Sequence, residues 1–280
     1  MKFFAKKNAP SSLPKSREKQ FFFIIKNNWL TIFYVSFLYC VSLFPLCFFG
    51  GLNYIHYINL LKGESASSEL FSTLLYFALI LLPCFLFLSL GSAGAYGYFG
   101  QTLKTNEAGL KVFFRSIKKN FLPFLLLYFA EGLSFFLLVF NYAFYLYIPF
   151  DPVLKLMLLI VSVLFVFLFF LAKPYFVIQI LFFNTSIIAL IRNSFLLPFS
   201  RLFHSFTTLL SSSIFYICFF FWPIDYLFIL IVLFIIFGGA ISLLFSLSFN
   251  FSSLEKSLPK EQLGTLYHVG LLSEDQKEKE

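Results

Sequence analysis

Long runs of apolar residues, separated by short polar segments, dominate the chain. Six runs are long enough to cross a hydrocarbon core of about 30 Å, which takes about 20 helical residues. We expect these spans at residues 29–49, 70–90, 124–148, 153–172, 203–222 and 226–249. The pattern therefore predicts an all-α fold: a polytopic transmembrane helical bundle of about six spans.

Helix-breaking residues separate the runs. Gly50 and Gly51 follow the first span, and proline-containing turns at 149–152 and 222–225 predict that spans three and four, and five and six, are antiparallel hairpins. The assignment of two segments stays open. Residues 52–61 are too few to cross the bilayer, and residues 174–183 could extend span four along the membrane interface.

Basic residues then orient the bundle, because Lys and Arg concentrate on the cytoplasmic side of membrane proteins. Nineteen of the 21 lie on one side of the predicted spans, and only Lys62 and Lys155 lie on the other. Both termini are thus expected in the cytoplasm. We divide the chain into a basic N-terminal segment (1–28), the transmembrane bundle (29–253) and a charged cytoplasmic tail (254–280) that we expect to be solvated.

Composition excludes several other classes of protein. With 60% hydrophobic and 12% charged residues, the chain does not resemble a soluble domain. The net charge of +8 comes from loops between apolar runs, so we expect anionic lipid headgroups, and no nucleic acid, as partners. The cysteines lie in apolar segments without a C-x-x-C pair, so we expect neither a disulfide framework nor a metal or cofactor site.

Small residues recur every third position after the second span, at Gly91, Gly94, Gly97 and Gly100. In lipid, such residues let helix backbones approach closely, which predicts a tight helix crossing. The alternative is a flexible or broken helix end at the cytoplasmic face, where a substrate path could lie.

Residues 108–121 have the pattern of an interfacial amphipathic helix. One face carries the aromatic and aliphatic residues Phe114, Ile117 and Phe121, and another carries the basic residues Lys111, Arg115 and Lys118. The helix either rests passively on anionic headgroups or docks a cytoplasmic partner.

Glu131 is the only acidic residue well inside an apolar run. A carboxylate there costs roughly 2.5–3.5 kcal/mol on insertion scales, so it should face the bundle interior or be protonated. Segments 117–124 and 191–199 resemble each other, and Glu131 and His204 each fall eleven residues after the asparagine of their segment. We hypothesise that these two side chains face each other; the alternative for Glu131 is a packed polar residue near the interface.

Residues that could catalyse a reaction are sparse. The chain has three histidines, and it contains no G-x-S-x-G, H-E-x-x-H or P-loop pattern. We therefore expect a protein without enzymatic activity.

Three stretches together resemble the YesL-like family of small bacterial integral membrane proteins. They are Leu82-Pro83, the Gly-Ser-Ala-Gly-Ala-Tyr run at 91–96, and Phe-Phe-Arg-Ser-Ile-Lys-Lys-Asn-Phe at 113–121. Residues 188–198 are similar to the family's second cytoplasmic segment. This chain is longer than the family pattern, since residues 29–70 resemble an additional span with a loop and the charged tail is extra. The resemblance implies an association with carbohydrate importers and no catalytic residues.

These features favour an accessory or regulatory component of a transport system in the bacterial cytoplasmic membrane. The expected partners are other membrane transport subunits or a cytoplasmic ATPase. Two alternatives stay open: a solute transporter or permease subunit with Glu131 on its pathway, and a membrane scaffold or assembly partner.

Overall fold

The chain folds into helices joined by short connections. The computed structural model describes residues 13–63, 66–106, 108–183, 186–221, 227–259 and 263–271. In chain order the elements are α1 (Arg17–Lys62), α2 (Ser67–Thr105), α3 (Lys111–Tyr147), α4 (Pro152–Phe182), α5 (Ile187–Ser200), α6 (Leu202–Ser212), α7 (Ile214–Phe221), α8 (Leu227–Leu233), the π-helical turn η2 (Phe234–Gly238), α9 (Gly239–Ser257) and the 3₁₀ turn η3 (Gly264–Leu266). These residues contain no strand, and the predicted all-α class is confirmed.

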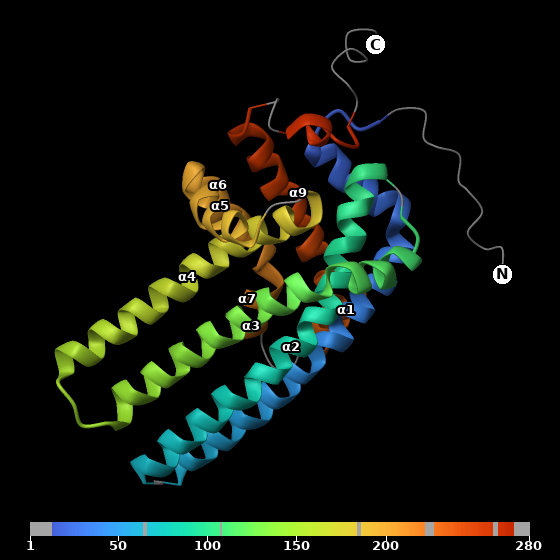
Figure 1. Cartoon of the computed structure of the whole chain (residues 1–280). Helices are drawn as coiled ribbons and strands as arrows, with labels where there is room; N and C mark the ends of the chain where they lie inside the picture. The colour runs from blue at the N-terminus through green and yellow to red at the C-terminus, as the bar shows by residue number, and fades with distance from the viewer. Residues whose placement is uncertain are drawn as a thin grey trace.

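Five helices in the described ranges are long and apolar enough to cross a membrane. They are α1, α2, α3, α4 and the stretch Ile229–Ser257, which contains most of α8 together with η2 and α9. Two long hairpins, α1 with α2 and α3 with α4, extend from the rest of the bundle (Figure 1). Within the most apolar 18-residue stretch of α4, only 6% of the residues are buried inside the protein, so this stretch presents most of its surface to lipid. The chain is a multi-pass helical membrane protein.

The predicted span 203–222 is not one continuous helix. α6 ends at Ser212 and α7 begins at Ile214, with a turn at Ser213 between them. Three consecutive serines occupy 211–213, and serine favours such breaks because its hydroxyl competes for backbone hydrogen bonds. Residue 222, the end of the predicted span, lies outside the described residues.

The chain nevertheless returns across the bundle between α4 and α9. Phe182 at the end of α4 stacks on Phe251 near the end of α9, with ring centroids 4.6 Å apart. Both helices therefore finish at the same end of the molecule, and the segment between them must run back. The interrupted pair α6 and α7 forms part of this return pass.

Several expected boundaries are wrong because helices continue through them. Gly50 and Gly51 do not end α1, which reaches Lys62. The two segments whose assignment stayed open both belong to long helices, since α1 includes residues 52–61 and α4 extends through residues 174–182. The amphipathic stretch 108–121 is not a separate helix either, since α3 runs from Lys111 to Tyr147. In a bilayer no water replaces a broken backbone hydrogen bond, so helices tolerate internal glycine and proline.

A buried polar cluster joins the two ends of the chain at one end of the bundle, which the basic residues predict to be the cytoplasmic end. Arg17 at the start of α1 forms an ion pair with Glu255 near the end of α9, and both side chains are almost fully buried. Arg17 also donates to the carbonyl oxygen of Val269, at 2.8 Å.

The C-terminal tail differs from the expected solvated extension. α9 continues past the predicted boundary at residue 253 to Ser257. Further along, Leu263 and Leu271 are buried, because these apolar side chains pack against the bundle. The tail is thus bound to the bundle over residues 263–271, and residues 272–280 lie outside the described part.

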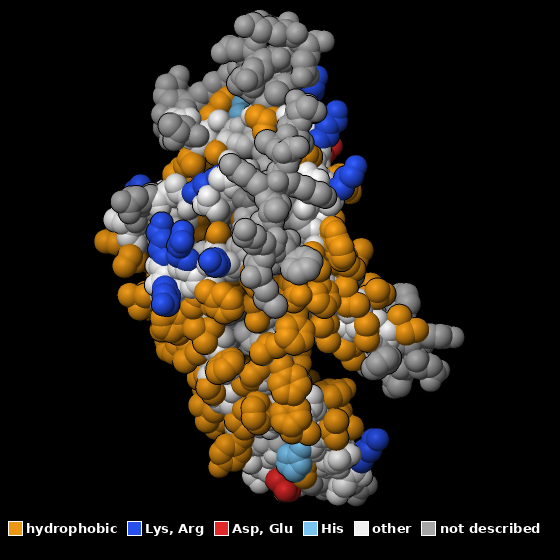
Figure 2. All heavy atoms as spheres, turned by 90° about the vertical axis from the view of Figure 1, so that its right-hand side faces the viewer, with side chains coloured by type: hydrophobic (Ala, Val, Ile, Leu, Met, Phe, Trp, Pro, Cys, Tyr) orange, Lys and Arg blue, Asp and Glu red, His pale blue; other side chains and the backbone are white. Residues whose placement is uncertain are grey.

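Charge is distributed unevenly over the surface. In Figure 2, Lys and Arg side chains gather toward the upper part of the molecule, while hydrophobic side chains cover its middle and lower parts. Charged side chains reappear at the opposite tip. This arrangement suits a bundle whose apolar middle contacts lipid and whose basic end contacts headgroups and water.

Candidate functional site

Glu131 forms an ion pair inside the bundle. Lys173 of α4 donates to both carboxylate oxygens of Glu131 on α3, each at 2.8 Å. The Lys173 ammonium also lies 4.4 Å from the ring centroid of Tyr128, one helical turn before Glu131. Glu131 is 4% exposed, so its charge is neutralised by Lys173 rather than by water.

The sequence interpretation missed Lys173 as the partner of Glu131. Lys173 directly follows the predicted span 153–172 and counts as one of the cytoplasmic cations. The positions of the two residues along the α3–α4 hairpin nevertheless indicate that they could meet. Glu131 lies seventeen residues before Ile148 and Lys173 lies twenty-two residues after Asp151, so an antiparallel hairpin brings them to similar depths.

His204 and Glu131 have different partners. The Nε2 atom of His204 on α6 lies 3.2 Å from the carbonyl oxygen of Phe249 on α9. Both oxygens of Glu131 accept a hydrogen bond from Lys173. The contacts of the two side chains therefore do not support the hypothesis that they face each other.

The ion pair offers little for metal or cofactor chemistry. Both oxygens of Glu131 already accept a hydrogen bond from Lys173. Among the described residues, no group of three or more His, Cys, Asp or Glu side chains could hold a metal ion. The observed arrangement is suited to joining α3 to α4 in a medium of low dielectric constant.

The glycine-rich stretch lies within the continuous helix α2, and residues 91–100 are all buried. Its glycines face side chains of three other helices: Gly91 faces Ser42 of α1, Gly94 faces Phe113 and Gly97 faces Ser116, both of α3, and Gly100 faces Leu181 of α4. A Cβ atom at Gly94 would lie 2.6 Å from the ring of Phe113, closer than real side chains approach. This geometry corresponds to the tight-crossing interpretation, with α2 at the centre.

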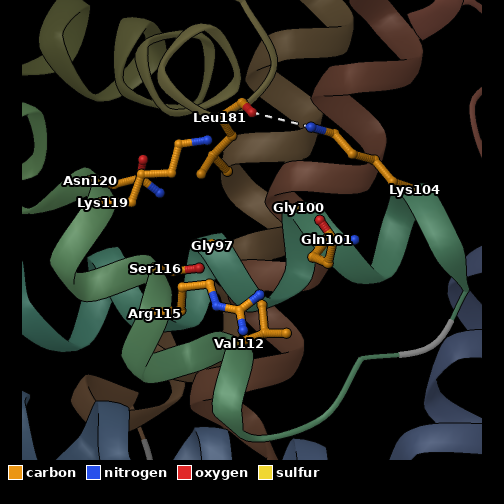
Figure 3. A pocket seen from close by; sticks show the side chains of 10 residues that line it. All are labelled: Gly97, Gly100, Gln101, Lys104, Val112, Arg115, Ser116, Lys119, Asn120 and Leu181. Carbon is orange, nitrogen blue, oxygen red and sulfur yellow. Dashed lines mark hydrogen bonds between the residues drawn. The ribbon is translucent and has the colours of Figure 1, made fainter.

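A basic cavity of about 240 Å³ opens where these helices cross, at the end of the bundle that the basic residues predict to be cytoplasmic. Figure 3 shows its walls, which come from α2, α3 and the end of α4. The lining residues are Gly97, Gly100, Gln101, Lys104, Val112, Arg115, Ser116, Lys119, Asn120 and Leu181. Three of these ten residues are cationic and none is acidic.

Lys104 lies beyond the apolar run of α2, in the last turn of that helix. Its ammonium donates to the carbonyl oxygen of Leu181 at 3.4 Å and lies 4.6 Å from the ring centroid of Phe182. Burial lowers the pKa of Lys104 below its usual range, and the positive charge of Lys119 lowers it further. The cavity therefore concentrates like charges.

The basic residues predicted on one face of the amphipathic stretch divide between two environments. Arg115 lines the cavity, together with Lys119 one turn later. Lys111 and Lys118 do not line it, and all four of these basic residues are exposed. Sequence reasoning missed Lys104 and Lys119, because only the crossing of α2 and α3 brings them together with Arg115.

Comparisons with known proteins add no relatives to this description. The sequence matches no protein-family model and no curated protein, and the fold matches no solved structure.

Proposed function

We propose that the chain is a non-enzymatic protein of the bacterial cytoplasmic membrane that serves as an accessory or regulatory component of a carbohydrate transport system. The observation that carries the proposal is the exposed basic start of α3, where Lys111, Arg115 and Lys118 lie at the surface of the cytoplasmic end. Such a face is available to a cytoplasmic subunit. The resemblance of residues 82–121 to YesL-like proteins favours a link with carbohydrate importers.

Direct transport of a solute past Glu131 has less support. A carboxylate on a transport pathway needs an oxygen that water or solute can reach. Glu131 is 4% exposed, and Lys173 engages both of its oxygens. The ion pair in the bundle is thus shielded from solute, whereas the predicted cytoplasmic end presents the exposed cations Lys111, Arg115 and Lys118.

Purification of the full chain from its host membranes in a mild detergent tests the proposal. We expect permease subunits and a cytoplasmic ATPase to co-purify at nearly stoichiometric amounts. A variant carrying Lys111→Glu and Lys118→Glu should release them, because reversed charges repel the docked surface. The matched control reverses two cations predicted on the outer side, Lys62→Glu and Lys155→Glu, and should keep the partners.

Other outcomes identify the alternatives. Absence of transport subunits at stoichiometric levels would contradict the accessory role. Stable partners unrelated to transport would instead indicate a scaffold. Solute uptake that needs no partner, and that is lost in a normally expressed Glu131→Gln variant, would establish the transporter alternative.

A further inference from the structure

The basic cavity has the composition of an anion-binding site. Lys104 approaches from α2, and Arg115 and Lys119 approach from successive turns of α3. Figure 3 shows Lys104 and Lys119 extending toward Leu181 from two sides, with Arg115 on the opposite side of the cavity. Three cations thus surround one space from different directions.

No acid neutralises these cations within the part of the chain that the structure describes. The ten lining residues include no Asp or Glu. Lys104 has a long hydrogen bond to a carbonyl oxygen and an aromatic ring beneath it, which solvate its charge without cancelling it. Like charges gathered in this way repel one another, and a bound anion would remove the repulsion.

Neutral hydrogen-bond donors complete the lining. The hydroxyl of Ser116 and the amides of Gln101 and Asn120 share the cavity with the cations. Gly97 and Gly100 lie in the cavity wall where α2 packs closely on its neighbours: a Cβ atom at Gly97 would overlap Ser116, and one at Gly100 would lie 3.2 Å from Leu181. These glycines therefore bring the helices that carry the cations together around the cavity.

The size and charge of the cavity select among anions. Its volume of about 240 Å³ lies below the roughly 300–1,000 Å³ of sites for drug-sized ligands, so it suits a small group. A carboxylate is planar and is satisfied by one Arg fork. A phosphate spreads its charge over oxygens that point in several directions, which matches three cations and three neutral donors placed around it.

We propose that the cavity lined by Lys104, Arg115 and Lys119 binds a phosphate group. At the cytoplasmic end of a membrane protein, that group comes either from an anionic phospholipid headgroup or from a soluble phosphorylated molecule. The site shares Arg115 with the exposed basic face on which the proposed accessory function rests, whereas Lys104 and Lys119 line only the cavity and Lys111 and Lys118 lie outside it.

The test uses the delipidated full chain in a non-ionic detergent and follows thermal unfolding at constant ionic strength. One arm titrates inorganic phosphate against chloride. The other adds phosphatidylglycerol against phosphatidylcholine, in which choline screens the phosphate. Two double variants of α3 with equal net charge are compared: Arg115→Ala with Lys119→Ala, and Lys111→Ala with Lys118→Ala.

We expect the wild type and the Lys111→Ala/Lys118→Ala variant to be stabilised by the anion. The Arg115→Ala/Lys119→Ala variant should lose about tenfold or more in apparent affinity, since two charge-assisted contacts disappear. Stabilisation by inorganic phosphate identifies a soluble ligand, and stabilisation by phosphatidylglycerol alone identifies a lipid headgroup. The proposal is overturned if neither anion stabilises the wild type, or if both double variants respond equally, because general surface charge then explains the effect.

Discussion

Removing the charge of Glu131 should destabilise the bundle substantially. The Glu131→Gln variant leaves the Lys173 ammonium without its counter-charge among aromatic side chains. Breaking a buried pair by removing one partner costs about 3–5 kcal/mol. The Lys173 side chain is 17% exposed and reaches toward the interface, so we expect a cost at or below the lower limit of this range, about 2–3 kcal/mol.

A double variant separates the ion pair from the packing. In Glu131→Leu with Lys173→Met, both charges disappear and side chains of similar length fill the space. Replacing a whole buried pair by apolar residues is often neutral or stabilising, so we expect a free energy of unfolding within about 1 kcal/mol of the wild type or above it. The single changes should therefore be strongly non-additive.

Thermal unfolding in detergent micelles, followed by circular dichroism, measures this difference. At about 2–4 °C per kcal/mol for a chain somewhat smaller than this one, Glu131→Gln should lower Tm by about 4–12 °C. A single variant with unchanged Tm would refute the reasoning. So would a double variant as unstable as the sum of its parts, since Glu131 would then contribute by shape rather than charge.

Two further predictions concern the glycines and the buried polar cluster around Arg17 and Glu255. Gly97→Ala should lower stability by about 1–3 kcal/mol, because its Cβ would overlap Ser116, whereas Gly50→Ala, with open space around it, should be neutral or stabilising in the same unfolding assay. Arg17→Ala should remove the ion pair with Glu255 and the hydrogen bond to the carbonyl oxygen of Val269, and so speed proteolytic cleavage within 263–271; an unchanged cleavage rate would show that apolar packing alone holds the tail.

The local pattern of apolar residues was sufficient to predict the class of the fold. Apolar runs of about 20 residues have one stable solution in a bilayer, which is a helix, and the described residues confirm it. The ends of helices were harder to predict. Glycine and proline favour helix ends in water, yet α1 continues through Gly50 and Gly51 and α4 through Pro174, because lipid offers no replacement for their backbone hydrogen bonds.

The ion pair of Glu131 and Lys173 was likewise only partly predictable from sequence. Glu131 could be singled out from sequence, since a carboxylate within an apolar run needs a partner. Its partner could not be assigned from composition, because Lys173 looked like one more cytoplasmic cation. Depth along an antiparallel hairpin, rather than distance in sequence, determines which charges meet.

By itself, the sequence determined that the chain spans a membrane, which end is basic, and which acid is buried among apolar residues. Only the tertiary structure decided that Lys104, Arg115 and Lys119 surround one cavity and that the tail binds the bundle. The reason is physical. Transfer to lipid depends on local composition, whereas the meeting of charges depends on how closely the glycines of α2 let its neighbours approach.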